Sequence, residues 1–435
     1  MSSSQNKPPL IATISWILYD FANTAYSMNV VSLYFGTWII ITLHQSDFYV
    51  SLANSISMIL VALTLPVLGD LADRKGKKLF SLFVFTITCI IGTAILGILG
   101  TRATNISLII PAAIIIFIIA NYGYQGGLVF YNALIPAVST PKTMGRVSGY
   151  GVALGYLGSI TGLSIAGVFV DGNLYGLQIP GITAGGAPAA FLPTAALFFV
   201  FALPIFIFLK EPPLPDGMPR SWRLKDSYAR VLQALSDTQK YPGLLRFLVA
   251  KLFYEDSIQT IIIFMGVYAQ SVVGFTLAET KQFFIIVIPS AIVGSAICGI
   301  LTDHYGPKKT LLAVLVLWMI SLSIVVLTSS QAVFWGMGAV IGALLGSTWT
   351  SARPLLITLV PKENLGEFFG LYALSGKVAA ILGPLVWSTV SFAFSSFGDV
   401  IKYKAATAAL MVIMVVGFMI LRGVPDFHKQ IKSGA

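Results

Sequence analysis

Charged residues are scarce in this sequence. Asp, Glu, Lys and Arg make up 10% of its 435 residues, whereas about a quarter of the residues in a soluble domain are charged. Hydrophobic residues account for 56%, and the mean hydropathy is +0.86. Water is therefore not the main solvent of this chain, and we predict a protein of the lipid bilayer.

Histidine and cysteine are scarcer still. The sequence holds three histidines and two cysteines, Cys89 and Cys298, and each of them stands alone. This excludes the clustered ligands of a metal centre and the paired cysteines of a disulfide framework. The phosphate-binding loop of ATPases, the Gly-x-Ser-x-Gly turn and the His-Glu-x-x-His motif are also missing. We therefore expect no metal, no cofactor and no enzymatic activity.

Long apolar runs, by contrast, are abundant. A helix of about 18 apolar residues or more can cross the hydrocarbon core of a bilayer. We predict twelve such spans, at residues 12–43, 48–68, 79–100, 106–136, 145–170, 190–209, 243–271, 280–301, 310–328, 331–360, 366–394 and 400–421. The Gly- and Pro-rich connection from Asp171 to Pro193 is expected to be irregular. In the fifth span, Gly151, Gly155, Gly158 and Gly162 predict close packing against a neighbouring helix.

Positive residues gather on one side of this predicted topology. Twenty of the 27 Lys and Arg residues fall in the termini, the polar segment 210–242 and alternate loops. The opposite loops hold only Arg102, Lys281, Lys402 and Lys404. The positive-inside rule then predicts that both termini and segment 210–242 are cytoplasmic. Because topology accounts for the net charge of +10, we do not expect nucleic-acid binding.

The two halves of the chain resemble each other. The loop at residues 69–78 reads Gly-Asp-Leu-Ala-Asp-Arg-Lys-Gly-Lys-Lys, and four of its positions recur at an offset of 230 in the loop at 299–309. Asp20 and Thr24 align with Asp256 and Thr260 at an offset of 236, and residues 145–149 align with 366–370 at an offset of 221. We therefore predict an N-terminal bundle at 1–209, a linker at 210–242 and a C-terminal bundle at 243–435.

These motifs resemble the major facilitator superfamily, whose signature loop follows its second helix. The sequences Tyr-Asp-Phe-Ala-Asn-Thr-Ala-Tyr at 19–26, Phe-Tyr-Asn-Ala-Leu-Ile-Pro at 130–136 and Glu-Phe-Phe-Gly-Leu-Tyr at 367–372 are similar to its vacuole-effluxer-like branch. The resemblance implies an all-α fold of two pseudo-symmetric six-helix bundles and a secondary transporter that works by alternating access. The yeast vacuolar member of this branch implies export of amino acids.

Charges inside the predicted spans indicate where a site would lie, because a charge at mid-bilayer costs about 2.5 to 3.5 kcal/mol on insertion scales. The resemblance implies that the first, fourth, seventh and tenth spans line a central cavity, and most of these charges fall on them. The predicted site for substrate or coupling proton combines acids, bases and amides: Asp20, Asn23, Asn132, Glu255, Asp256, Gln259, Arg353 and Lys377. Opposed charges suit a zwitterion such as an amino acid, and a drug-like or other organic ion is the alternative.

Two of these charges have competing interpretations. Glu255 stands four residues after Lys251, so the two either neutralise each other structurally or serve the site. Arg353 either binds a substrate carboxylate or is a buried counter-ion that ties the halves together.

The repeated loops are predicted to form a cytoplasmic gate. Its residues are Gly69, Asp73, Arg74, Gly76, Lys77, Asp303 and Gly306. Drug/proton antiporters of the superfamily carry an Arg three residues before a Gln-Gly pair in the fourth span. Here Tyr122 stands at that position before Gln125, which disfavours proton coupling of that kind.

A non-transporting receptor or scaffold that recruits a partner through the linker 210–242 is the competing hypothesis. Otherwise the expected partners are a small-molecule substrate, a coupling proton or ion and the lipid bilayer. We expect a monomeric, multi-pass protein of a prokaryotic inner membrane. The sequence leaves the direction of transport and the coupling ion open.

Overall fold

The computed structural model describes residues 8–45, 47–102, 105–174, 177–211, 241–275 and 277–428. The chain divides into two compact units. Unit 1 comprises Met1–Thr140 and Leu154–Trp222, and unit 2 comprises Pro141–Ala153 and Arg223–Ala435. One helix, α6, therefore begins in unit 2 and continues in unit 1.

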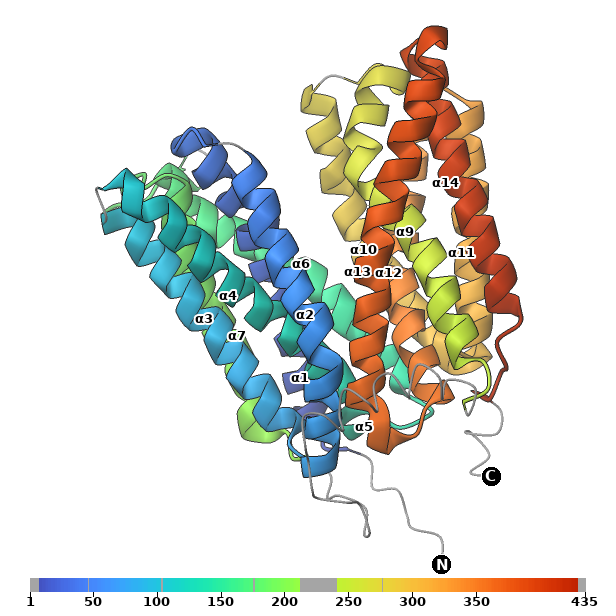
Figure 1. The fold of residues 1–435 in the computed structure, drawn as a ribbon, viewed down its shortest axis with the longest axis horizontal. Coiled ribbons are helices and arrows are strands. Elements are labelled where there is room, and N and C mark those ends of the chain that lie inside the picture. The colour runs from blue at the N-terminus through green and yellow to red at the C-terminus, as the bar shows by residue number, and fades with distance from the viewer. Residues whose placement is uncertain are drawn as a thin grey trace, which may run out of the picture. The chain divides into compact units, whose positions relative to one another are not determined.

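Unit 1 is built from long helices. They are α1 (Leu10–Tyr26) with the π-helical segments η1 (Ser27–Tyr34) and η2 (Thr37–Thr42), α2 (Asp47–Lys75), α3 (Lys78–Arg102), α4 (Ile106–Ala133), the short α5 (Ile135–Val138), α6 (Met144–Asp171) and α7 (Phe191–Phe208). The hairpin strands β1 (Asn173–Leu174) and β2 (Leu177–Gln178) and the 3-10 turn η3 (Ala187–Ala190) connect α6 to α7. Figure 1 shows α3 running beside α4.

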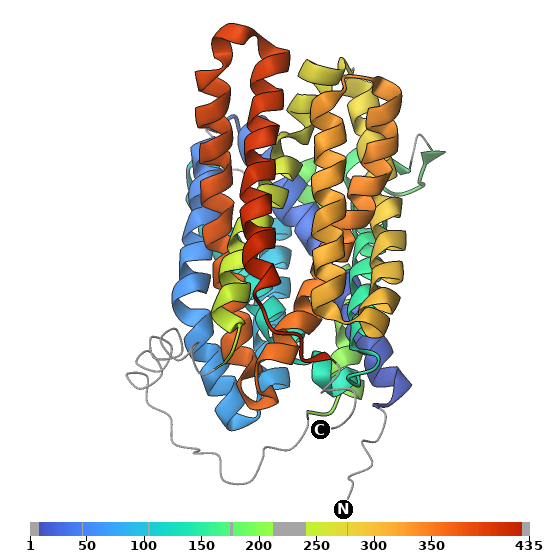
Figure 2. The same ribbon diagram turned by 90° about the vertical axis from the view of Figure 1, so that its right-hand side faces the viewer.

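Unit 2 repeats the pattern. Its elements are α9 (Leu244–Tyr268) with the π-helical η5 (Ala269–Val273), α10 (Leu277–Tyr305), α11 (Pro307–Leu327), α12 (Gln331–Leu359), η6 (Lys362–Asn364), α13 (Leu365–Ala393), η7 (Ser395–Phe397) and α14 (Asp399–Arg422). Figure 2 shows α13 and α14, in red, running next to each other. The first long helix of each half, α1 or α9, thus continues into a π-helical segment.

Helix packing within the units confirms the internal repeat. In unit 1, α3 packs on α4 and α7, α2 packs on α4, and α1 packs on α7. In unit 2, α11 packs on α12 and α14, α10 packs on α12, and α9 packs on α14. Each pair in unit 2 joins the helices that correspond to a pair in unit 1. The two halves therefore share this pattern of helix packing as well as their sequence motifs.

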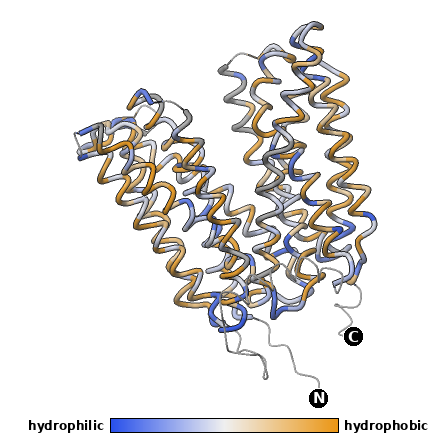
Figure 3. The backbone as a smooth tube through the Cα atoms, viewed as in Figure 1, coloured by the Kyte–Doolittle hydropathy of each residue, from blue (hydrophilic) through white to orange (hydrophobic). Residues whose placement is uncertain are grey.

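The surfaces of the helices are suited to lipid. In the described part of the chain, eight helical segments are long and apolar enough to cross a membrane. Large apolar side chains point outward from them: Val200 is 59% exposed, and Val412 is 59% exposed. Figure 3 shows hydrophobic residues along the helices and hydrophilic residues at many of the helix ends. Soluble proteins rarely expose apolar surface on this scale, so the chain is a multi-pass membrane protein.

The predicted architecture is confirmed. Twelve long helical segments in the described ranges coincide with the twelve predicted spans, and α12 at Gln331–Leu359 differs from its prediction by one residue. The connection from Asp171 to Pro193 is less irregular than predicted, since its backbone pairs Asn173 with Gln178 in a short hairpin. The linker, predicted at 210–242, lies largely outside the described residues.

Candidate functional site

The middle of α9 carries charged side chains that are packed against α13. Aromatic pairs mark the two ends of this contact. Phe247 stacks on Tyr372 with ring centroids 6.2 Å apart, and Phe264 stacks on Trp387 at 4.7 Å. Between the two pairs, glycines of α13 face charged and polar side chains of α9. We call this contact the polar seam; its residues are Lys251, Glu255, Asp256, Thr260, Tyr372, Gly376 and Gly383.

Lys251 and Glu255 form an ion pair one helical turn apart on α9. The Lys251 side chain is 2% exposed and that of Glu255 is 13% exposed, so the pair is largely removed from water. Lys251 Nζ also lies 4.0 Å from the centroid of the Tyr372 ring, a favourable cation-π contact. A Cβ at Gly376 would come within 2.8 Å of Lys251 Nζ, so the glycine allows α13 to lie against the ion pair.

Asp256 binds the backbone of α13. Its Oδ1 accepts a hydrogen bond from the Gly383 N–H at 2.7 Å, and the residue is 1% exposed. Pro384 follows inside the helix and has no N–H to donate to the preceding turn, which weakens α13 at this point. A Cβ at Gly383 would come within 2.9 Å of Asp256 Oδ1 and would overlap Thr260 Oγ1. The three residues therefore converge on one small space.

Arg353 and Gln259 are half-buried in unit 2. Arg353 precedes Pro354 inside α12, and α12 packs on α9. Arg353 therefore lies on a helix that packs against the helix carrying Lys251, Glu255 and Asp256. Lys377 follows Gly376 on α13, but its side chain lies outside the described residues.

The other predicted site residues belong to unit 1. Asp20 and Asn23 are 3% and 2% exposed on α1, and Asn132 is half-buried on α4. Within the described part of the chain, Asn23 Oδ1 and Asn132 Oδ1 are buried without a hydrogen-bond partner. Trp16 ties α1 to α4 here, because its Nε1 donates to the Tyr131 carbonyl at 3.0 Å and the two rings stack. Buried amide oxygens with no partner mark a place where a polar ligand would be favoured.

The close packing predicted for Gly155, Gly158 and Gly162 of α6 is confirmed in unit 1. A Cβ at Gly155 would come within 2.7 Å of Thr24 Oγ1, and one at Gly162 would come within 2.8 Å of the Ala25 side chain. At Gly158 a Cβ would collide with the Phe21 carbonyl. These glycines let α6 lie directly against the face of α1 that follows Asp20.

Ion pairs hold the loop between α2 and α3. Arg74 Nε lies 2.8 Å from Asp70 Oδ1, and Lys78 Nζ lies 2.8 Å from Asp73 Oδ1. Gly76 has a φ of +57°, a left-handed conformation that glycine adopts without a steric penalty. Two of the predicted gate residues, Asp73 and Arg74, are thus fixed by neighbours in the same segment.

Glu211, which follows α7, caps the start of α3. Its carboxylate accepts hydrogen bonds from the backbone N–H groups of Lys78 at 2.8 Å and Leu79 at 3.0 Å. The first N–H groups of a helix have no partner within the helix, and an acid there also suits the helix dipole. Lys77 is exposed with its Nζ 5.7 Å from the Phe80 ring centroid, and Gly69 is buried in α2.

In unit 2, Asp303 caps the start of α6 in the same manner. Its Oδ1 accepts a hydrogen bond from the Gly145 N–H at 2.7 Å. Its Oδ2 accepts hydrogen bonds from the backbone N–H of Arg146 at 3.1 Å and from the Arg146 Nε at 2.7 Å. The second loop of the repeat thus carries an acid that binds both a helix terminus and a guanidinium.

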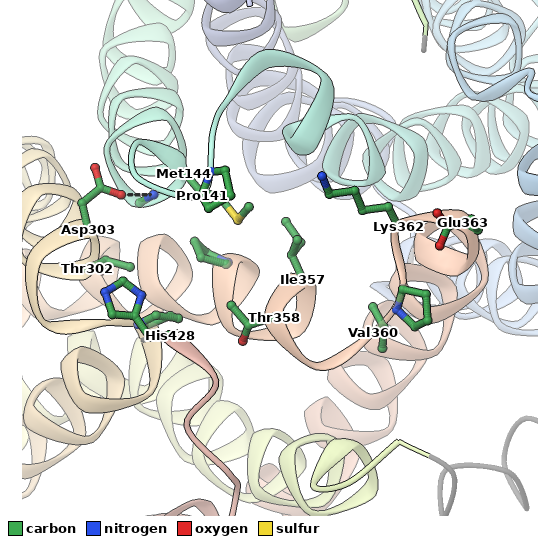
Figure 4. A pocket seen from close by; sticks show the side chains of 14 residues that line it. Pro141, Met144, Thr302, Asp303, Ile357, Thr358, Val360, Lys362, Glu363 and His428 are labelled. Carbon is green, nitrogen blue, oxygen red and sulfur yellow. Dashed lines mark hydrogen bonds between the residues drawn. The ribbon is translucent and has the colours of Figure 1, made fainter. Parts of the chain in front are cut away.

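A cavity of about 310 Å³ lies beside Asp303 (Figure 4). Met144, Ile357, Lys362 and His428 are among the residues that line it. Gly306, with a φ of +95°, lies beneath the His428 ring: a Cβ at Gly306 would come within 2.8 Å of the ring carbon Cγ. His428, in the segment after α14, therefore packs on the second gate loop.

Several residues of these contacts are missing from the predicted site and gate. They are Asp70, Lys78, Arg146, Glu211, Thr260, Tyr372, Gly376 and Gly383. The repeat carried a signal for two of them, because Gly155 and Gly162 correspond to Gly376 and Gly383 at the same offset of 221 that aligns the fifth and eleventh spans. The capping partners join segments more than 130 residues apart, and no local pattern in the sequence indicates such pairs.

Comparison with known proteins identifies relatives along nearly the whole chain. The family described as "Vacuole effluxer Atg22 like" matches residues 38–433. The uncharacterized MFS-type transporter YxiO of Bacillus subtilis is 27% identical over 437 residues, covering 95% of this chain and 94% of YxiO. The multidrug resistance protein MdtG of Enterobacter lignolyticus is 27% identical over 397 residues, covering 87% of this chain and 85% of MdtG.

Solved structures share the fold. A bacterial homologue of the iron transporter ferroportin, in an outward-facing state, has a TM-score of 0.70 at 13% identity and covers 97% of this chain and 98% of its own. The fucose:proton symporter FucP of E. coli has a TM-score of 0.70 at 14% identity, with 95% and 97% covered. At these identities the likeness establishes the fold and nothing finer.

Proposed function

Because the chain belongs to the Atg22-like vacuole effluxer family of major facilitator transporters, which are not enzymes, we propose that it moves a small polar solute across the membrane by alternating access. We further propose that the solute is a zwitterion such as an amino acid and that the direction is export. The family name and the relatives support transport. The chemistry of the buried charges supports the choice of solute.

The observation that carries the proposal is the polar seam. Lys251, Glu255 and Asp256 are charged residues in the middle of a membrane span, and Lys251 and Asp256 are each 1% exposed. Removing such groups from water is expensive unless they are paired or serve a ligand. A protein that only recruited partners would gain nothing from keeping these groups in a span, so we do not propose the scaffold function.

Opposed charges favour a zwitterion over a drug-like cation. Arg353 offers a planar fork that holds both oxygens of a carboxylate, and the acids of the site offer partners for an amino group. Tyr122, which replaces the Arg of drug/proton antiporters, pairs its hydroxyl with Thr64 at 2.8 Å. The position is therefore satisfied by a neutral hydrogen bond, which supports a solute other than the cations that such antiporters expel.

The hydrogen bonds that cap the starts of α3 and α6 support a gate at the ends of the helices where Lys and Arg residues gather. Asp303 holds the start of α6, and α6 continues into unit 1 from Leu154 onward. Glu211 holds the start of α3 next to the Asp73–Lys78 ion pair. We propose that these contacts break and re-form as access alternates, on the cytoplasmic side of a prokaryotic inner membrane.

A thermal-shift screen tests the proposed solute. The purified protein is heated with single amino acids, short peptides, nucleosides and cationic drugs at two pH values. We expect stabilisation by one class of amino acid, and loss of that stabilisation in Arg353→Ala. Stabilisation by cationic drugs alone would contradict the zwitterion. Transport would be contradicted if the activity in cells survived Asp20→Asn, Asp256→Asn and Arg353→Ala but was lost on deletion of residues 212–240.

A further inference from the structure

The contact between Asp256 and Gly383 has features of a site that binds and releases a small cation. In the described part of the chain, the one hydrogen bond of the Asp256 side chain is the 2.7 Å bond from the Gly383 N–H, and it makes no ion pair there. The neighbouring Glu255 is neutralised by Lys251. Asp256 is therefore a carboxylate at 1% exposure with little to hold its charge.

Thr260 supplies a second and independent observation. It lies one turn after Asp256 on the same face of α9 and is fully buried at 0% exposure. In the described part of the chain its hydroxyl oxygen has no hydrogen-bond partner. It converges with Asp256 Oδ1 on the space beside Gly383. A buried hydroxyl without a partner is costly, and a group that enters this space from Asp256 would satisfy it.

Among the described residues, none of the ionisable side chains on the helices packed against α9 forms an ion pair with Asp256. These groups are Arg353 on α12, Glu367, Tyr372 and Lys377 on α13, and Asp399, Lys402, Tyr403, Lys404 and Arg422 on α14. The side chains of Glu367 and Lys377 lie outside the described residues. Tyr372 is engaged with Lys251, and Lys402 with Asp399 at 2.6 Å.

We propose that Asp256 is the site of the coupling proton, with Thr260 and the Gly383 N–H as its partners. The proposal rests on the proposed transport function and names its driving ion. The carboxylate takes one proton from water on one face of the membrane and returns it to water on the other face. In the protonated state the new O–H on Oδ1 donates to Thr260 Oγ1, and Oδ1 still accepts the hydrogen bond from the Gly383 N–H.

The ligand set favours a proton over a sodium ion. Sodium is a hard cation that needs several oxygen ligands, and the oxygens among the three atoms nearest to this space are one carboxylate oxygen and one hydroxyl. The Gly383 N–H also directs its positive end into the space, where it would repel a metal ion. A proton needs only one oxygen and one acceptor.

Infrared difference spectroscopy on the full-length protein in lipid nanodiscs tests this site without any transported solute. Spectra recorded across a pH titration report the carbonyl stretch of a protonated carboxylic acid buried in the protein. We expect a titrating band in the natural chain, its complete loss in Asp256→Asn and its retention in Asp20→Asn. Asparagine retains an acceptor for the Gly383 N–H, so the fold should survive. Thr260→Val should shift the frequency of the band, because the acid loses its hydroxyl partner.

Two outcomes would overturn the proposal. One is a band that persists in Asp256→Asn or is lost in Asp20→Asn instead. The other is a titration whose midpoint falls when sodium chloride replaces choline chloride, which would assign the space to sodium. A titrating Asp256 band in a protein that carries no amino acid would support this site and contradict only the proposed solute.

Discussion

The Asp303 carboxylate binds Arg146 twice, through the guanidinium Nε at 2.7 Å and through the backbone N–H at 3.1 Å. The two residues are 157 positions apart, so this contact ties the end of α10 to the start of α6. Because the same carboxylate also binds the Gly145 N–H, one acid satisfies two N–H groups of a helix terminus and neutralises a base. A gate of this kind has defined contacts that single substitutions can remove.

Asp303→Asn is expected to slow transport several-fold while leaving substrate binding unchanged. Asparagine loses the ion pair with Arg146 and keeps a single carbonyl oxygen for the N–H groups. Asp73→Asn should act likewise, because it removes the ion pair with Lys78. Initial rates in proteoliposomes and thermal-shift binding give the two readouts. Lys75→Gln is the control, because Lys75 is exposed near the same loop and is not one of the predicted gate residues. Loss of binding at a normal transport rate would show that these residues belong to the site and not the gate.

Removing one member of the Lys251–Glu255 pair is expected to destabilise the protein more than replacing both members. Lys251→Met leaves the Glu255 carboxylate unpaired in a largely buried place, which typically costs about 3 to 5 kcal/mol. Melting temperature and yield should drop clearly in this variant and recover in Lys251→Met combined with Glu255→Gln. If the double variant also transports normally, the pair is structural. If it is stable but inactive, the pair serves the solute.

Close packing of α6 on α1 predicts opposite effects for two glycine substitutions. A Cβ at Gly158 would collide with the Phe21 carbonyl, whereas one at Gly36 would meet nothing within 4 Å. Gly158→Ala should lower the melting temperature. Gly36→Ala should be neutral or slightly stabilising, since alanine is favoured over glycine in a helix by up to about 1 kcal/mol. Equal effects of the two changes on a melting curve would contradict the packing.

Much of the fold was predictable because lipid imposes a simple rule on sequence. Every span must be long and apolar, so its ends are visible: α13 begins at Leu365 and ends at Ala393, against a prediction of 366–394. The repeat was predictable because its loop residues are polar and stand out. The π-helical segments η1 and η5 were not, because the change of hydrogen-bonding pattern leaves the composition unaltered.

The site was predictable only in part. Asp256 and Glu255 stand out as charges in an apolar run. Their partners, Gly383 and Lys251, differ in how far the sequence reveals them. Lys251 lies one turn away on the same helix and was visible as a pair. Gly383 contributes a backbone N–H, and a glycine in an apolar span usually indicates packing. Which helix lies against which is a property of the folded chain, so the polar seam needed the structure.

Arg353 gives the sharpest distinction between a binding role and a structural role. Arg353→Lys keeps the charge and loses the fork that grips both carboxylate oxygens. If Arg353 binds the solute, affinity should fall at least tenfold with an unchanged melting temperature. If it is a buried counter-ion, Arg353→Ala should lower the melting temperature, and combination with Asp20→Asn or Asp256→Asn should restore it. Unchanged affinity and transport in all of these variants would remove Arg353 from the site.

Counterflow of amino acids in proteoliposomes tests whether this chain transports an amino acid. Vesicles that contain the purified chain are loaded with an unlabelled amino-acid mixture and diluted into trace amounts of single labelled amino acids. We predict transient accumulation of at least one labelled amino acid, absent from empty vesicles and strongly reduced in Arg353→Ala. Counterflow that is absent for every amino acid, in vesicles where the protein is folded, would contradict the proposed solute.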